Sequence, residues 1–409
     1  MVTQTVVVRY ETEKVKSAKG WVLIYGRRKV GKTFLVRNHI DHDLYMLVKR
    51  GGGALIDGGP LASTDDYHQV MEMVSKGLVE GKTVVVDEFH RLPEEFIESL
   101  QMVYPKGKLY LLGSSMHVAR ELMSKNSPLL GLLSEVKISL LSPVDILSAL
   151  SENMSVEDAI TLGPYLRDPW AIKHLDSSPE RTIRSILEYS RNAIPALMGE
   201  VFLDEDRFLS DVYEAIVRSI ASGRNTLKEV SDQLFSRGLI DANDPSRIRP
   251  YVKNMERMDI IEMVPFFNRR GYHYSIRPKI MELYYYLEER YGLESEEDAV
   301  IRAVIEDRVP IHVESFLGEL MADLLGGVNR YHVTKDFDID ILITKRNTPI
   351  FVGEVKWKKK VGKGEVFKFL NRVQDYSCPK AIISKTPIET EDVDIYTPER
   401  ILAMVRDRN

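Results

Sequence analysis

A glycine-rich segment that ends in a lysine and a threonine is the part of this sequence with the clearest chemical meaning. Its residues, in order, are Gly26, Arg27, Arg28, Lys29, Val30, Gly31, Lys32 and Thr33. In such a G-x-x-x-x-G-K-T spacing, glycines let backbone N–H groups curl around phosphates, Lys32 supplies a cation near the β and γ phosphates, and the Thr33 hydroxyl can bind Mg²⁺. An apolar run, 21–25, directly precedes it. The segment therefore predicts a phosphate-binding loop between a strand and a helix.

Two carboxylates follow a second apolar run. Asp87 and Glu88 come directly after residues 83–86, as in a buried parallel strand that delivers acids to its C-terminal edge. Asp87 would hold Mg²⁺ through water, and Glu88 would polarise the attacking water. A third run, 108–112, leads to Ser114, whose hydroxyl would sense the γ-phosphate unless it is an ordinary turn residue. The three elements in this order indicate a P-loop NTPase.

A resemblance to a known family rests on these motifs. Segments 25–33, 85–92 and 112–115, together with the Ser-Pro-Leu at 127–129, resemble the archaeal-type ATPases, a group of AAA+ and STAND-like P-loop proteins. Members often carry a winged helix and a nuclease-like C-terminal domain. The resemblance implies ATP and Mg²⁺ as cofactors. Members commonly have an arginine shortly after the Ser-Pro-Leu, whereas residues 130–133 contain none, which puts an arginine acting from a neighbouring copy in doubt.

The middle of the chain, residues 205–292, reads as a winged helix-turn-helix. Thr226 and Glu229 have the spacing of a helix-capping box, and residues 260–265 and 272–276 read as the wing strands. The basic residues on the expected recognition helix and at the wing tip are Arg249, Lys253, Arg257, Arg269 and Arg270. They fit phosphate contacts along DNA. The alternative is a winged helix that docks a protein and leaves a solvated, charged face.

A second group of residues suited to Mg²⁺ chemistry lies near the C-terminus. Residues 336–343 and 349–357 read as two strands joined by a turn. Their alternation puts Asp338 with Asp340 on one face, and likewise Glu354 with Lys356. The pattern resembles the restriction-endonuclease-like core, which implies that Asp340 and Glu354 bind Mg²⁺ and that Lys356 orients or activates water.

That fold usually takes a further acid from a preceding helix. Here the candidate helix, 314–325, offers Glu319, with Glu314 and Asp323 as alternatives. The position where relatives tend to place this acid falls on Ala322, which cannot bind a metal ion. A degenerate site, without the full set of metal ligands, is therefore the alternative.

Composition is consistent with a multidomain protein of the reducing cytoplasm. The chain has 409 residues, which allows two to four units, and its 56 Lys and Arg against 61 Asp and Glu give a net charge of −5. Binding to nucleic acid would therefore depend on local basic patches. The lone Cys378 excludes an internal disulfide framework. We expect neither a signal peptide nor a membrane span, because no apolar stretch is long enough.

These observations predict an α/β protein of four parts. The expected parts are a P-loop ATPase core of the AAA+ kind (1–142), a helical lid packed on it (143–204), the winged helix (205–292) and an α/β restriction-endonuclease-like domain (300–409). The expected function is an ATP-binding and hydrolysing switch, with DNA and further copies of the same chain as its expected partners, and nucleic-acid cleavage is left open. The alternative is a non-enzymatic, nucleotide-gated regulator or scaffold whose nuclease-like domain is degenerate.

Overall fold

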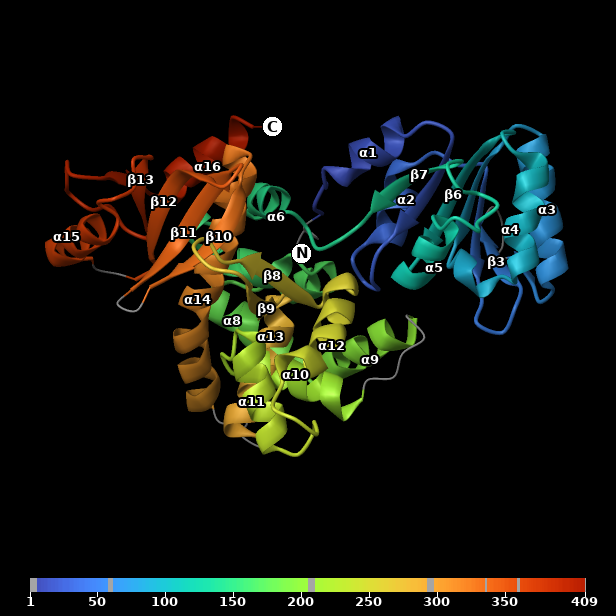
Figure 1. Cartoon of the computed structure of the whole chain (residues 1–409). Helices are drawn as coiled ribbons and strands as arrows, with labels where there is room; N and C mark the ends of the chain where they lie inside the picture. Colours follow the sequence, from blue (N-terminus) through green and yellow to red (C-terminus); the bar gives the residue numbers. More distant parts are fainter. Residues whose placement is uncertain are drawn as a thin grey trace. The chain divides into compact units, whose positions relative to one another are not determined.

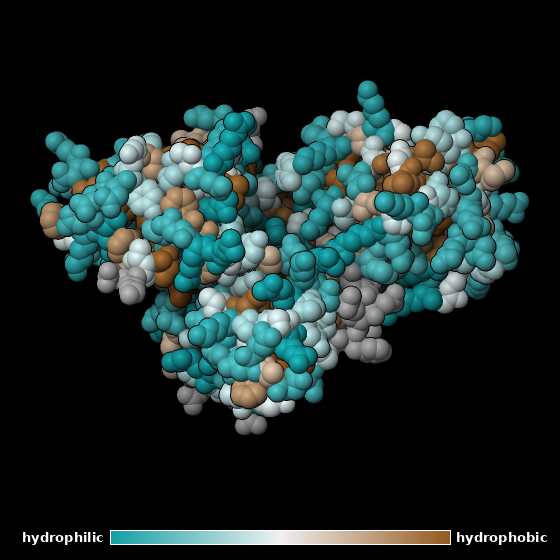
Figure 2. All heavy atoms as spheres, in the orientation of Figure 1, coloured by the Kyte–Doolittle hydropathy of each residue, from teal (hydrophilic) through white to brown (hydrophobic). Residues whose placement is uncertain are grey.

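The chain divides into two compact units, which are described separately. The computed structural model describes residues 6–57, 62–204, 210–292, 298–334, 337–358 and 361–408. The first unit contains Arg9–Leu140 and Ala196–Leu209, and the second contains Met1–Val8, Leu141–Pro195 and Ser210–Asn409. Within the described ranges, no helix is long and apolar enough to cross a bilayer, and the face in Figure 2 is mostly hydrophilic.

The first unit is built on a seven-stranded sheet with the order β4-β3-β2-β5-β6-β1-β7. The strands are β1 (Trp21–Tyr25), β2 (Leu44–Val48), β3 (Ala54–Asp57), β4 (Ala62–Thr64), β5 (Thr83–Asp87), β6 (Lys108–Gly113) and β7 (Leu133–Lys137). The neighbouring strands β2 and β5, β5 and β6, β6 and β1, and β1 and β7 pair parallel. Strand β3 pairs antiparallel with both β2 and β4. The strands predicted from the three apolar runs are confirmed as β1, β5 and β6.

Helices cover both faces of this sheet (Figure 1). They are α1 (Glu11–Ser17), α2 (Lys32–His39), α3 (Tyr67–Val79), the short η1 (Phe89–Arg91), α4 (Glu94–Val103) and α5 (Met116–Leu122). Leu23 of β1 packs with residues of α3, α4 and α5, whereas its neighbour Ile24 packs with residues of α1 and α2. The central strands are apolar at consecutive positions because both of their faces are buried.

The second unit begins with helices and contains a two-stranded hairpin. The elements are α6 (Pro143–Leu150), α7 (Val156–Leu166), η2 (Pro169–His174), α8 (Pro179–Tyr189), α10 (Asp211–Ala221), α11 (Leu227–Ser236), α12 (Pro245–Arg257), β8 (Ile261–Pro265), β9 (Tyr272–Ile276), α13 (Lys279–Tyr291) and α14 (Asp298–Leu325). The predicted capping box of Thr226 and Glu229 is confirmed at the start of α11. Strands β8 and β9 are antiparallel. Residues 205–209 of the predicted winged-helix range lie outside the described residues.

The C-terminal part of the second unit is a five-stranded sheet with the order β10-β11-β12-β13-β14. Its elements are β10 (Val328–Val333), β11 (Asp338–Lys345), β12 (Thr348–Lys356), α15 (Lys363–Arg372), β13 (Lys380–Ser384), β14 (Asp394–Tyr396) and α16 (Pro398–Arg406). Strands β11 and β12 pair antiparallel, which confirms the predicted turn between them. Asp336, the first residue of the predicted strand, lies outside the described residues.

Of the helices in the range predicted to form a lid, 143–204, helices α6, α7 and α8 belong to the second unit. A Cβ atom on Gly163 of α7 would lie 2.6 Å from Cζ of Phe316 of α14, so the glycine allows the two helices to approach closely. The indole N–H of Trp357 donates a hydrogen bond of 3.0 Å to Oγ1 of Thr161. Helix α9 (Ala193–Asp204) begins in the second unit and enters the first at Ala196.

Candidate functional site

The glycine-rich loop joins β1 to α2, as the sequence predicts. Gly26 has a φ of 155°, and a Cβ atom there would lie 1.9 Å from the carbonyl oxygen of Ile138, so a side chain is excluded. Gly31 precedes α2 with a φ of 95°, in the left-handed region. Nζ of Lys32 donates to the carbonyl oxygens of Gly26 and Arg27 at 2.7 and 2.9 Å. The lysine ammonium thus lies inside the loop that would surround the phosphates.

Asp87, at the end of β5, lies beside the first turn of α2. Its Oδ2 atom accepts hydrogen bonds from the hydroxyls of Thr33 at 2.6 Å and of Tyr45 at 2.5 Å. Asp87 is 1% exposed, and its Oδ1 atom is buried without a hydrogen-bond partner in the described structure. Burial and the neighbouring carboxylate of Asp87 raise the pKa of Tyr45. A carboxylate with an unsatisfied oxygen next to a threonine hydroxyl fits Mg²⁺, a hard cation that takes oxygen ligands.

Glu88 occupies a left-handed conformation, with φ of 58°, directly after β5. Its Oε2 atom lies 3.0 Å from a guanidinium nitrogen of Arg91, 3.5 Å from Nε2 of His90 and 4.0 Å from a guanidinium nitrogen of Arg28. The hydroxyl of Ser114 donates to the same oxygen at 3.2 Å. The structure therefore brings together the loop, the carboxylate expected to polarise water and the expected γ-phosphate sensor.

Two residues at this site were not found by sequence reasoning. Tyr45 reaches Asp87 because β2 pairs with β5, with Leu47 opposite Asp87. Arg91 reaches Glu88 because the two residues lie one turn apart around η1, and it also donates to the carbonyl oxygen of Val48 at 2.7 Å. The spacing of Glu88 and Arg91, one helical turn apart, could have predicted their ion pair from the sequence. Nothing in the sequence around Tyr45 indicates its contact with Asp87.

The strands β11 and β12 place Asp340 and Glu354 next to each other. Oδ2 of Asp340 accepts a hydrogen bond of 2.7 Å from the backbone N–H of Val355. Burial, and then the charge of Glu354, raise the pKa of Asp340 to about 7. Oε1 of Glu354 lies 2.5 Å from Nζ of Lys356 and 3.7 Å from a guanidinium nitrogen of Arg372. Asp340, Glu354 and Lys356, which the sequence predicted to act together, therefore form one cluster, hereafter the acidic cluster.

Of the three helical acids that the sequence leaves open, Glu314 is the one whose charge interacts with this cluster, and Glu319 does not. Burial, and then the charges of Asp340, Asp338 and Glu354, raise the pKa of Glu314 well above its ordinary value. Glu319 instead forms an ion pair with Arg167. The reason is helical geometry, since residues 314 and 319 lie on different faces of α14.

Asp323 also lies away from the acidic cluster. Burial, and then the charge of Glu319, raise its pKa, so it shares the surroundings of Glu319. Across the described residues, no group of three or more histidine, cysteine, aspartate or glutamate side chains is arranged to hold a metal ion. The acidic cluster therefore lacks a preformed set of three such metal ligands.

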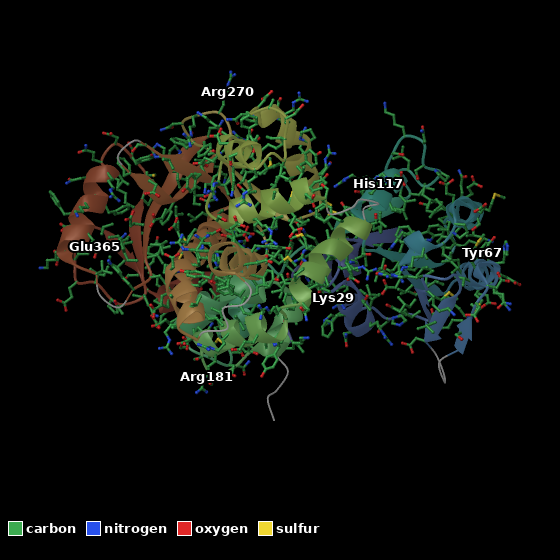
Figure 3. All side chains as sticks on the ribbon, turned by 90° about the horizontal axis from the view of Figure 1, so that it is seen from below. Lys29, Tyr67, His117, Arg181, Arg270 and Glu365 are labelled. Carbon is green, nitrogen blue, oxygen red and sulfur yellow. The ribbon has the colours of Figure 1, made fainter. Side chains whose placement is uncertain are left out.

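The basic residues predicted to contact DNA are exposed. Arg249, Lys253 and Arg257 lie on the outer face of α12, and Arg269 and Arg270 lie in the turn between β8 and β9. The guanidinium of Arg269 lies 3.8 Å from the ring centroid of Phe266. In Figure 3, the labelled Arg270 and Arg181 lie on opposite sides of the second unit.

The hairpin of β8 and β9 is attached to the edge strand β10. The backbone N–H of Phe267 donates to the carbonyl oxygen of Tyr331 at 3.0 Å, and Nδ2 of Asn268 lies 2.8 Å from Nε2 of His332. The rings of His273 and Tyr331 stack with centroids 3.9 Å apart. These contacts fix the turn that carries the two exposed arginines relative to the C-terminal sheet.

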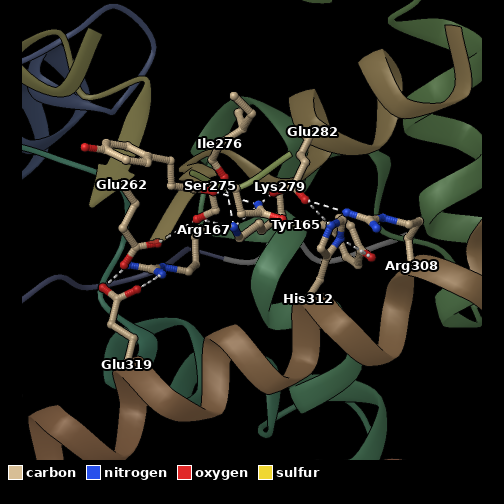
Figure 4. Close-up of polar contacts among 12 residues, drawn as sticks. Tyr165, Arg167, Glu262, Ser275, Ile276, Lys279, Glu282, Arg308, His312 and Glu319 are labelled. Carbon is tan, nitrogen blue, oxygen red and sulfur yellow. Dashed lines mark hydrogen bonds and ion pairs between the residues drawn. The ribbon is translucent and has the colours of Figure 1, made fainter. Parts of the chain in front are cut away.

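A buried polar network joins three helices of the second unit (Figure 4). Glu282 of α13 accepts from Lys279 at 3.0 Å and from Arg308 of α14 at 2.8 Å, and it lies 3.2 Å from Nε2 of His312. The other ring nitrogen of His312 lies 2.9 Å from the hydroxyl of Tyr165 of α7. Burial alone would raise the pKa of Glu282, but the surrounding positive charges lower it.

Comparison with known proteins agrees with the geometry of the first unit. Residues 18–142 match the family described as the AAA domain. The matched residues include the loop, Asp87, Glu88 and Ser114, and the match supports nucleotide binding and hydrolysis by this part of the chain.

Relatives over a longer stretch are distant. An uncharacterized protein of Methanocaldococcus jannaschii is 27% identical over 268 residues, which is 59% of this chain and 57% of that protein. The chain thus spans little more than half of that relative's length. The Walker-type ATPase of Pyrococcus abyssi is 18% identical with a TM-score of 0.46, over 68% of this chain and 96% of that one. A STAND protein with a tetratricopeptide repeat sensor from Pyrococcus horikoshii is 15% identical with a TM-score of 0.32, over 79% and 50% of the two chains.

Proposed function

We propose that this protein is a molecular switch that binds ATP at the loop of residues 26–33 and hydrolyses it. The observation that carries the proposal is the pairing of Thr33 with Asp87, whose second oxygen is buried without a hydrogen-bond partner among the residues that the structure describes. Thr33 and Asp87 would hold Mg²⁺, which when bound supplies positive charge at the phosphates. Lys32 would bind the β and γ phosphates, and Glu88 would accept a proton from the attacking water.

The test is phosphate release from ATP by the wild type and by Lys32→Ala, each with and without Mg²⁺. We expect turnover only in wild-type protein with the metal, because Lys32 supplies the cation inside the loop. Equal turnover by the two proteins would reject the proposed site. Nucleotide binding, followed with a fluorescent ATP analogue, separates loss of binding from loss of the chemical step.

We propose in addition that α10, α11, α12, β8 and β9 form a winged helix that binds DNA. Support comes from the order of the elements, three helices followed by a hairpin, and from the exposed basic residues of α12 and of the hairpin turn. The net charge of −5 leaves such a local patch as the source of attraction to phosphate. Hydrolysis at the loop would then control how this part engages DNA.

One part of the alternative, the degenerate nuclease-like domain, is favoured by the acidic cluster. Glu354 is already paired with Lys356 and Arg372, and the described residues offer no three-ligand metal group. We therefore propose that residues 300–409 have a restriction-endonuclease-like fold whose site is degenerate. Incubation of DNA and RNA with the protein in Mg²⁺ or Mn²⁺ tests this, since any cleavage that requires Asp340 would show an active nuclease.

A further inference from the structure

Arg28 of the phosphate-binding loop lies between two carboxylates of the first unit. One guanidinium nitrogen is 4.0 Å from Oε2 of Glu88, and another is 3.5 Å from Oε1 of Glu200 on α9. The Arg28 side chain is only 18% exposed. A second arginine, Arg50, also approaches Glu200, at 3.8 Å. Glu200 therefore holds a loop arginine through a different guanidinium nitrogen from the one that faces Glu88, the residue proposed to activate water.

The position of Arg28 matters because of what its two neighbours would do. The loop would surround the phosphates, and Glu88 would hold the attacking water in line with the γ-phosphate. A guanidinium within reach of Glu88 is thus at the γ-phosphate end of the site. Arginine binds phosphate oxygens through two parallel hydrogen bonds. An arginine at this place stabilises the charge that develops during phosphoryl transfer.

The sequence offers no arginine at the place where relatives commonly have one. Residues 130–133, directly after the Ser-Pro-Leu, are Leu, Gly, Leu and Leu. A copy of this chain could not supply a charge to a neighbour's site from that segment. Arg28 is on the loop itself, so it could supply the charge within one chain.

We propose that Arg28 stabilises the transition state of ATP hydrolysis within its own chain, and that Glu200 holds Arg28 away from the γ-phosphate. The inference rests on the proposed ATP hydrolysis. In the reaction, the water oxygen bonds to the γ-phosphorus, the bond from that phosphorus to the bridging oxygen breaks, and ADP leaves while Glu88 takes the proton. Arg28 would move from the two carboxylates to the γ-phosphate oxygens. Glu200 is thus a positioning residue and not a catalytic one.

The location of Glu200 suggests what this arrangement controls. Helix α9 is one of the segments through which the chain passes from the second unit into the first. Glu200 follows that division closely and pairs with the loop. One of the covalent connections between the units therefore has a direct electrostatic contact with the nucleotide site, and a shift of α9 would change the rate of hydrolysis.

Steady-state ATP hydrolysis by the full chain tests the inference. The variants are Arg28→Ala, Arg28→Lys and Glu200→Gln, with Glu98→Gln on the exposed side of α4 as a control that also removes one carboxylate charge. For Arg28→Ala we expect kcat to fall by at least about a hundredfold, with little change in the affinity for a fluorescent ATP analogue. Arg28→Lys should restore little, because an ammonium lacks the two-pronged geometry. Glu200→Gln should raise kcat several-fold with KM nearly unchanged, and Glu98→Gln should match the wild type.

The outcomes separate the two proposals. Retained analogue binding shows that Arg28→Ala is folded, and kcat within about twofold of the wild type in that variant would then overturn the inference alone. Specific activity that rises with protein concentration would also overturn it, since a residue from another copy would be required. If kcat is unchanged in Glu200→Gln, Glu200 does not hold Arg28 away from the γ-phosphate. Wild-type protein that binds nucleotide without turnover would overturn the proposed hydrolysis and this inference together.

Discussion

Arg167 of α7 and Glu319 of α14 form a two-pronged ion pair between residues 152 positions apart in sequence. The two nitrogen–oxygen distances are 2.5 and 2.7 Å, and Nε of Arg167 also donates to the carbonyl oxygen of Leu141. The Arg167 side chain is 8% exposed. Glu319 is one of the three acids that the sequence offered for a metal site, and its carboxylate is engaged by Arg167 instead. The pair connects α7, before the winged-helix segment, to α14, after it.

Glu319→Gln should therefore destabilise the second unit. Removing one partner of a buried pair leaves the other charge uncompensated. We expect the free energy of unfolding to fall by about 2–3 kcal/mol. This is less than for a fully buried pair, because the Glu319 side chain is 30% exposed. Urea denaturation followed by circular dichroism measures the effect. Glu391→Gln, which removes an exposed carboxylate, serves as the control. The same unfolding midpoint in both variants would show that the pair contributes nothing.

Glu88→Gln should preserve nucleotide binding and slow hydrolysis by at least about a hundredfold, because an amide cannot accept the proton of the attacking water. The pairing of Glu88 with Arg91 and Ser114 places it beside the loop. Phosphate release and analogue affinity measured on the same preparation separate the two effects. Comparable turnover by this variant and the wild type would remove Glu88 from its proposed role.

Replacing Arg269 and Arg270 together with alanine should weaken DNA binding and lower its salt dependence by about one unit per lost phosphate contact. Both residues are exposed in the turn of the β8–β9 hairpin. Fluorescence anisotropy at several salt concentrations gives the slope. Lys173→Ala with Arg181→Ala removes the same charge from exposed positions elsewhere in the second unit. Equal slopes for the two double variants would indicate a hairpin that docks protein.

Any Mg²⁺-dependent cleavage of nucleic acid by this protein should depend on Asp340, Glu354 and Lys356. Asp340→Ala should abolish such cleavage and leave ATP hydrolysis nearly intact, because the acidic cluster and the loop belong to different units. Gel analysis of DNA and RNA substrates, alongside phosphate release, measures both. Cleavage that survives in Asp340→Ala would place the activity elsewhere.

The raised pKa of Asp340 predicts a pH-dependent stability. Its folded-state pKa is about 7, whereas an unfolded aspartate has a pKa of about 3.9. As pH rises between these values, the unfolded chain loses the proton first, so this group lowers stability progressively up to about pH 7. Asp340→Asn should therefore become more stable relative to wild type as pH rises from 4 to 8.

Thermal unfolding of both proteins at several pH values measures this difference. A stability difference that does not change with pH would show that Asp340 titrates normally. At pH 8, added Mg²⁺ should stabilise the wild type more than Asp340→Asn only if the acidic cluster binds the ion, which provides an independent check on the degenerate site.

Local sequence patterns predicted the elements that depend on neighbouring residues. The strands before and after the phosphate-binding loop, the capping box of Thr226 and Glu229 and the turn between β11 and β12 all follow from short-range spacing. The choice between Glu314 and Glu319 does not, because it depends on the rotation of α14 and on Arg167, far away in the chain. The packing of α7 likewise depends on Phe316 filling the space that Gly163 leaves.

The attachment of Phe267 and Asn268 to β10 has a consequence for solubility. Strand β10 is the first strand of its sheet, and an exposed strand edge can pair with another molecule and aggregate. The hairpin turn covers part of this edge with a backbone hydrogen bond, and Phe267 packs against the apolar core beneath the sheet. A fragment that starts after the hairpin would expose both the strand edge and the apolar surface. The C-terminal sheet is therefore protected from self-association by residues that come before it in the chain.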